Sequence, residues 1–167
     1  MMSERRRARG QSMVEFALAL PVLLLLIYGL IETSRLIFTV ASVNSASREA
    51  ARYGSAAGIA STGSTTLTYQ DCAGIRDAAR RVGFLLGLSD NQILIYHDTG
   101  PQSTATQYCL PGNSTDTSVT LVSGNRVLVN VTAQWTLLVP ILPFQSRTIS
   151  SGNTARTFMG VIEISTP

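Results

Sequence analysis

A glycine and a glutamate flank the start of the apolar N-terminal segment, at a spacing that suits proteolysis followed by charge pairing. Gly10 closes a short arginine-rich leader, Glu15 lies five residues later, and an uncharged run begins at Phe16. Cleavage after Gly10 would create an α-amine at Gln11, and Glu15 lies one helical turn away, where it can neutralise that amine. A secretory signal peptide has its cleavage site after the apolar segment, not before it. Cleavage here would leave the apolar segment on the mature chain.

The excess positive charge of the chain is confined to this leader. The net charge is +3, and residues 1–10 alone, with four arginines and one glutamate, account for it. The rest of the chain is neutral, so the basic pI does not indicate nucleic-acid binding. Arginines directly before an apolar helix predict a cytoplasmic N-terminus. The alternative to cleavage is an uncleaved signal anchor, in which Gly10 and Glu15 are coincidental.

The apolar run has the length and composition of a single membrane-spanning helix. Phe16 to Ile31 contains no charge, although at about 1.5 Å per residue this stretch alone is slightly short for a hydrocarbon core of ~30 Å. Counting from Gln11 makes the helix long enough and places Glu15 near the inner boundary, where a carboxylate is costly. Pro21 removes a backbone donor inside the run, so we expect a kink there.

Helical periodicity continues beyond the membrane. Glu32 and Arg35 are spaced to pair at i and i+3. A stripe of decreasing side-chain size then recurs at alternating steps of four and three: Leu36, Val40, Val43, Ser47, Ala50 and Gly54. One interpretation is the buried face of a helix packed on its own domain. The other is a seam where neighbouring subunits approach closely, as in a filament bundle. Gly54 predicts the end of the helix.

At this point the sequence resembles the TadE family, pseudopilins or minor pilins of the tight-adherence (Tad) pilus and secretion system. The resemblance is carried by the order of a class III prepilin leader and by three motifs. These are Val-Glu-Phe-Ala-Leu-Ala-Leu-Pro-Val at 14–22, Ile-Glu at 31–32 and Arg-Glu-Ala-Ala-Arg at 48–52. It is close over residues 10–54 and looser afterwards. At 167 residues, the chain is too long to resemble the major pilin, which is little more than the first helix.

The resemblance implies a role in assembly rather than catalysis. Gly10 and Gln11 would flank the cut of a prepilin peptidase, and Glu15 and Phe16 would serve processing and assembly. The implied partners are that peptidase, other pseudopilins or the major pilin, the Tad inner-membrane assembly platform and the lipid bilayer. The implied location is the cytoplasmic membrane, with a single span, a cytoplasmic N-terminus and an extracytoplasmic domain. The alternative function is an uncleaved, membrane-tethered domain that binds a surface or ligand.

The domain boundaries follow from changes in composition. We expect a leader at 1–10, a transmembrane and stalk helix at 11–54, a flexible Ser/Thr/Gly-rich linker at 55–70 and an extracytoplasmic domain at 71–167. Asp71 can cap a second helix that ends at Gly87. In that helix one face is apolar, and the charged side chains are expected in solvent. The apolar face comprises Ile75, Ala79, Val82 and Leu86; the charged residues are Arg76, Asp77 and Arg80.

Alternating apolar residues in the C-terminal half predict an antiparallel sheet of three to four strands. The strand signals are residues 92–96, 119–122, 127–138 and 146–164, the last broken near Gly152, with Ser-Gly-Asn as a hairpin turn after Val122. Strict alternation over 127–138 indicates one buried and one solvated face. The predicted fold class is therefore α+β: a long N-terminal transmembrane helix extended into a pilin-like domain with a second helix.

A proline-rich apolar segment lies between the last two predicted strands. It comprises Pro140, Ile141, Leu142, Pro143 and Phe144. The prolines exclude a central strand. The segment either folds over the domain's own core or forms an interface with the membrane or a neighbouring subunit.

The reactive side chains of the chain predict a disulfide rather than a catalytic site. Cys72 and Cys109 are the only cysteines, and outside the cytoplasm they are expected to pair, although two reduced buried thiols are the alternative. His97 is the only histidine and adjoins Asp98. A metal hydrolase needs more nitrogen or sulfur ligands, and a cysteine nucleophile needs a free thiol. We therefore expect no enzyme, metal or cofactor.

Overall fold

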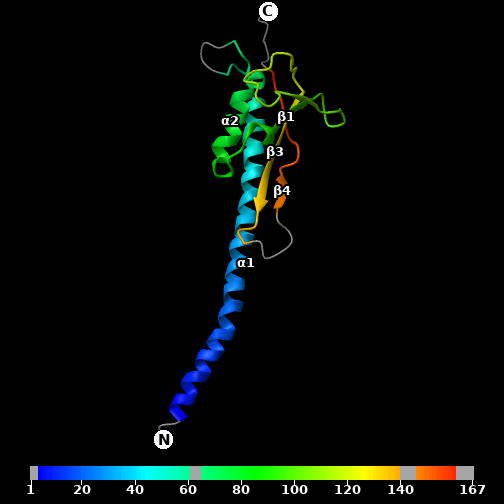
Figure 1. Cartoon of the computed structure of the whole chain (residues 1–167). Helices are drawn as coiled ribbons and strands as arrows, with labels where there is room; N and C mark the ends of the chain where they lie inside the picture. The colour runs from blue at the N-terminus through cyan, green and yellow to red at the C-terminus, as the bar shows by residue number, and fades with distance from the viewer. Residues whose placement is uncertain (1–3, 61–64, 140–145, 161–167) are drawn as a thin grey trace, which may run out of the picture.

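A computed structural model of the chain describes residues 4–60, 65–139 and 146–160. Its dominant element is helix α1, Glu4–Gly54, whose 51 residues correspond to a length of about 76 Å. Figure 1 shows α1 as a long stalk: the N-terminal half stands free, and the other elements surround the C-terminal half. The predicted long helix followed by an α+β domain is confirmed.

The C-terminal part of α1 packs on the protein's own domain through small side chains. The buried members of the stripe are Val43, Ser47, Ala50 and Gly54. Gly54 ends the helix at a close approach, since a Cβ there would lie 3.1 Å from both Ile75 and Val127. Leu36 is half-buried and Val40 is exposed. The first interpretation of the stripe, intramolecular packing, therefore holds from Val43 onward.

Helix α2, Cys72–Val82, lies beside the C-terminal half of α1 (Figure 1). Asp71 caps it, as predicted, by accepting a hydrogen bond of 2.9 Å from the backbone N–H of Gly74. The helix ends at Val82, earlier than the predicted Gly87. The chain tightens there into the 3₁₀ helix η2, Phe84–Leu86, before Gly87 turns in the left-handed conformation with φ of 58°.

The sheet is antiparallel throughout and is built around one long strand. The order is β2-β1-β3-β4, and β5 also pairs with β3. The strands are β1 Ile93–Asp98, β2 Thr106–Tyr108, β3 Arg126–Thr136, β4 Ser146–Ser150 and β5 Thr154–Thr157. On β3, Leu128 on the opposite face is buried as well and the strand ends at Thr136, so the strict alternation predicted over 127–138 holds only from Val129 to Thr136. The predicted buried face is confirmed at Val127, Val129, Val131 and Ala133. These side chains form a core with the small residues of α1 and with α2.

Among the described residues the sheet has five strands, one more than the upper limit of the prediction. The segment after residue 146 supplies two strands, β4 and β5, interrupted at Gly152, whose φ is 65°. The additional strand is β2, whose three residues pair with β1. A strand this short shows no alternation that a sequence pattern can reveal.

Residues 119–122 do not form the predicted hairpin arm. The turn at Ser-Gly-Asn exists, with a hydrogen bond from the N–H of Asn125 to the carbonyl of Val122. Both edges of the first part of β3 are already occupied, because β1 and β5 each pair with Arg126 to Val129. Leu121 instead buries its side chain in the core.

Part of the segment expected as a linker is held by backbone contacts. Ile59 and Leu67 form an antiparallel bridge, and the 3₁₀ helix η1, Thr68–Gln70, follows. Thr68 and Tyr69 are buried. Residues 61–64 lie outside the described part of the chain, and the flexibility of the segment stays a prediction.

Candidate membrane anchor and its contacts with the domain

The predicted cleavage and assembly residues lie at the exposed start of α1. Gln11 and Glu15 are one turn apart, and Nε2 of Gln11 donates a hydrogen bond of 3.2 Å to Oε1 of Glu15. Phe16 is 64% exposed. The backbone of α1 passes through Gly10 without a break. The helix therefore brings Glu15 within reach of residue 11, whereas cleavage and recognition stay predictions.

The N-terminal half of α1 has an apolar surface that no other part of the protein covers. It is the one helix among the described residues that is long and apolar enough to cross a membrane, judged by length and composition. None of its apolar window is buried within the protein. Exposed members include Leu18, Leu23, Leu24, Leu25, Leu26 and Leu30. A surface of this kind requires an apolar partner, either lipid or other helices.

Pro21 lies inside this surface. α1 remains helical on both sides of it, and Figure 1 shows a gentle curve in the blue, N-terminal part of the helix. Pro21 has no backbone N–H to donate to the carbonyl of Ala17, which weakens the helix locally. A kink at Pro21 that matters for function stays a prediction.

Two side chains at the C-terminal end of the apolar surface bind the segment that follows β3. The hydroxyl of Tyr28 donates to the carbonyl of Val139 at 2.9 Å, and the N–H of Val139 lies 3.3 Å from the same oxygen. Oε1 of Glu32 accepts a hydrogen bond of 2.7 Å from the N–H of Leu138. We call this set of contacts between Tyr28, Glu32 and residues 138–139 the stalk clasp.

Arg35 completes the charge balance of the stalk clasp. Its Nη1 lies 3.0 Å from Oε2 of Glu32, so the predicted ion pair is confirmed. The same nitrogen approaches the carbonyl of Thr136 at 3.4 Å. Glu32 is only 6% exposed, and burial of an unpaired carboxylate would be costly. The pairing with Arg35 was readable from the sequence, but the contact with Leu138 was not.

Cys72 and Cys109, both buried, form a disulfide that joins the start of α2 to the residue after β2. Beside it, Arg76 is buried, contrary to the expectation that it faces solvent. Its Nη1 donates to the carbonyl of Asn113 at 2.7 Å and its Nη2 to the carbonyl of Leu110 at 2.8 Å, with a further bond to the carbonyl of Cys109. Arg76 was missed because its partners are backbone carbonyls, which leave no charge signal in the sequence.

Several ionisable side chains of the domain have pKa values set by specific partners. The Arg126 guanidinium donates to both carboxylate oxygens of Asp98, and these hydrogen bonds lower the pKa of Asp98 despite its burial. Burial, followed by the 2.7 Å hydrogen bond to Asp71, raises the pKa of Tyr53 to about 12. His97 packs edge-to-face on Tyr108. The pair His97 and Asp98 is thus engaged in packing and in an ion pair.

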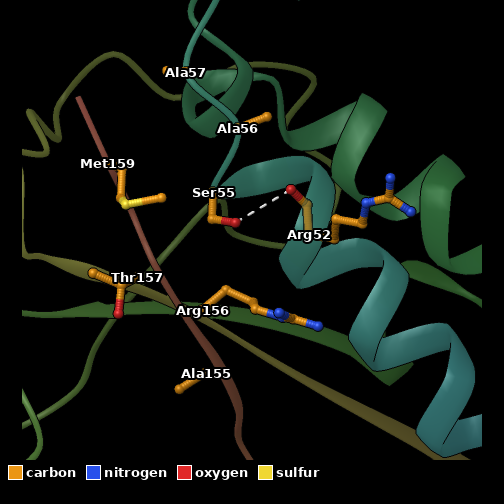
Figure 2. A pocket seen from close by; sticks show the side chains of 8 residues that line it. All are labelled: Arg52, Ser55, Ala56, Ala57, Ala155, Arg156, Thr157 and Met159. Atoms are coloured by element: carbon orange, nitrogen blue, oxygen red, sulfur yellow. Dashed lines mark hydrogen bonds between the residues drawn. The ribbon is translucent and has the colours of Figure 1, made fainter. Parts of the chain in front are cut away.

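A basic cleft lies at the end of the domain away from the clasp. Its volume is about 640 Å³, and Arg52 and Arg156 line it together with Ser55 and Thr157. Figure 2 shows both arginine side chains extending in the same direction past the last turns of α1. Two guanidinium groups can bind a carboxylate or phosphate. Arg52 is also 3.7 Å from Glu49, which moderates its charge.

Two further expectations concern metals and the proline-rich segment. Within residues 4–60, 65–139 and 146–160 there is no group of three or more His, Cys, Asp or Glu side chains able to hold a metal ion. The proposed interface at Pro140, Ile141, Leu142, Pro143 and Phe144 lies outside the described residues.

Comparison with known families identifies the helical part of the chain. A family model described as TadE-like protein matches residues 10–52. The matched region begins at Gly10 and covers the apolar surface, the Glu32–Arg35 pair and most of the packed stripe, so the resemblance seen in the sequence is confirmed over α1. No curated protein and no solved structure was found to match the chain.

Proposed function

We propose that this chain is a membrane-anchored pseudopilin, or minor pilin, that supports or initiates assembly of a Tad-type pilus after removal of its leader. The observation that carries the proposal is a helix that projects from the folded domain with an exposed apolar surface, which directly follows Gly10, Gln11 and Glu15 in the sequence. That helix is the region matched by the TadE-like family. In a filament or a membrane, such a surface is covered; in water it would not be.

The proposed orientation follows from the positive charge of the leader, at the N-terminal end of the helix. The leader arginines keep the N-terminus in the cytoplasm, so that the domain and its disulfide lie in the oxidising exterior. A prepilin peptidase in the membrane cuts between Gly10 and Gln11. The mature helix then contacts other pseudopilins or the major pilin, and the Tad inner-membrane assembly platform receives the subunit.

Glu15 has a specific role in this proposal. Its carboxylate lies one turn from Gln11 and is already bonded to that residue's side chain. Once cleavage exposes the α-amine, Glu15 compensates its positive charge in the same or a neighbouring subunit. A chain that only needed an anchor would avoid a carboxylate next to the hydrocarbon, because its burial is unfavourable.

The test is complementation of cells lacking this chain with Glu15 variants, scored by pilus number. Glu15→Ala and Glu15→Gln should both insert and yet give few pili, because each removes the charge. Glu49→Ala is the matched control, since Glu49 is a partly exposed glutamate of the same helix with a weak 3.7 Å ion pair; it should assemble normally. Normal pili with both Glu15 variants would instead favour the uncleaved, tethered binding domain.

A further inference from the structure

We propose that the base of the domain, at Leu138 and Val139, inserts into the outer leaflet of the bilayer. The domain is then seated in the membrane rather than held above it on the stalk. This inference rests on the proposed membrane anchoring of α1. Its partner is lipid, and it concerns side chains beyond the spanning helix itself.

The depth of the stalk clasp follows from the length of the span. A hydrocarbon core of ~30 Å corresponds to about 20 helical residues. A span that starts at Gln11 therefore ends near Leu30, and one that starts at Phe16 ends near Arg35. Tyr28 lies within both limits. Because the hydroxyl of Tyr28 is hydrogen-bonded to the carbonyl of Val139 at 2.9 Å, the segment that follows β3 lies at the depth of the outer hydrocarbon boundary.

The clasp also bonds three of the four backbone N–H and C=O groups of Leu138 and Val139, which favours non-helical backbone at this depth. Backbone groups in lipid must be satisfied within the protein. The N–H of Leu138 donates to Glu32 at 2.7 Å, and the carbonyl and N–H of Val139 both contact the hydroxyl of Tyr28. The side chains of Leu138 and Val139 are nevertheless 60% and 46% exposed. Polar groups therefore face α1, and apolar groups face outward.

A second apolar patch occurs at the same end of the domain, on η2. Phe84 and Leu85 are 72% and 64% exposed, and Leu85 borders the groove beside Phe38 of α1. Figure 1 shows α2, which leads into η2, and the end of β3 on opposite sides of α1. Both sides of the stalk therefore present apolar side chains where the headgroup region is expected.

Continuity with the spanning surface favours lipid over a neighbouring subunit. Leu30 and Ile31, at the end of the span, are 70% and 46% exposed and lead directly into the clasp. The first charge after the span, on Glu32, is covered and paired. No exposed carboxylate thus separates the spanning surface from Leu138.

The test uses the fact that the chain has a single tryptophan, at residue 135. In a Trp135→Phe background, a new tryptophan is placed at Leu138, and the full-length protein is reconstituted at one copy per lipid nanodisc. Discs with brominated acyl chains quench tryptophan that contacts lipid. Val122→Trp is the matched control, because Val122 is 61% exposed, like Leu138 at 60%, and lies beyond the other end of β3. Leu24→Trp reports insertion of the span.

The expected result is loss of most emission at positions 24 and 138 and none at 122. Quenching at position 24 without quenching at position 138 would overturn the insertion of Leu138 and Val139 into the bilayer. It would leave the proposed membrane span of α1 unchanged. Absence of quenching at 24 would contradict the anchored helix on which both proposals rest. A blue shift at 138 that appears only with several copies per disc would identify a second copy as the partner and overturn the lipid assignment. Val139→Trp provides a second reporter if Leu138→Trp does not fold.

Discussion

The carboxylate of Glu32 accepts a hydrogen bond of 2.7 Å from the backbone N–H of Leu138, a residue 106 positions away in the chain. This bond joins the last turn of the apolar surface to the segment that follows the central strand β3. With Tyr28 and Arg35 it ties the stalk to the domain. The clasp therefore extends the attachment of α1 to the domain toward the N-terminus, beyond the core packing that begins at Val43.

Removal of the Glu32 carboxylate should loosen this attachment. Glu32→Ala leaves the N–H of Leu138 without its acceptor and removes the ion pair of Arg35, which keeps only its 3.4 Å contact with the carbonyl of Thr136, at a cost of about 1–3 kcal/mol. Glu32→Gln keeps an acceptor for Leu138 and should lose less. The measurement is hydrogen exchange at the Leu138 amide in detergent or nanodiscs. Equal protection in wild type and Glu32→Ala would show that the bond does not hold the clasp.

Acid should destabilise the domain through Asp98. Its hydrogen bonds with Arg126 lower its pKa in the folded state, whereas the unfolded value is about 3.9. The stabilisation is therefore complete above about pH 4 and is lost as the pH falls through the lower, folded pKa. Asp98→Asn should be less stable than wild type at neutral pH and show a flatter fall in Tm below pH 4.

The control for this pH dependence is Asp77→Asn. Asp77 pairs with Arg80 at the surface with 65% of its side chain exposed, so its substitution should hardly change the Tm profile. A profile for Asp98→Asn that is as steep as that of wild type would assign the acid sensitivity to other carboxylates.

Reduction of the disulfide should weaken the domain. Cys72 and Cys109 are 37 residues apart, a separation for which chain entropy predicts about 3–4 kcal/mol of stabilisation. The double variant Cys72→Ser, Cys109→Ser should unfold at lower urea than the oxidised wild type. Wild type treated with a thiol reductant is the comparison, and it should approach the variant. Identical midpoints with and without reductant would show that the bridge contributes little.

Arg76 should contribute more to the stability of the folded domain than a charged residue on a helix surface would. Arg76→Met removes the hydrogen bonds that Arg76 donates to the carbonyls of Cys109, Leu110 and Asn113, a loss of about 2 kcal/mol or more. Arg76→Lys should recover only part of it, because an ammonium lacks the planar fork. Arg81→Met, at an exposed position of the same helix, is the control. Urea unfolding of all three variants measures the difference; equal midpoints for Arg76→Met and Arg81→Met would contradict it.

Long, periodic elements could be predicted from the sequence, and contacts between distant segments could not. The uncharged run, the stripe ending at Gly54 and the alternation on β3 are each long patterns. In each, many residues support the same secondary-structure prediction. β2 has only three residues, too few for a period. Residues 119–122 had a strand-like pattern, but the edges of β3 were already taken by β1 and β5.

The same reasoning applies to the candidate site. Gly10, Gln11 and Glu15 are local in sequence, so their relation was visible. Glu32 was visible as half of an i, i+3 pair, whereas its partner Leu138 contributes only a backbone N–H. A backbone N–H is present in almost every residue, so the sequence does not indicate which one binds Glu32. The stalk clasp could therefore be recognised only in the structure.

The central claim is that the leader is removed between Gly10 and Gln11. The direct measurement is the intact mass and N-terminal peptide of the protein from cells with and without the prepilin peptidase of its own system. Mass spectrometry is preferable to chemical sequencing, because an N-terminal glutamine can cyclise. We predict a chain that starts at Gln11 only when the peptidase is present. A mature chain that retains Arg5 to Gly10 beside an active peptidase would contradict the pseudopilin assignment.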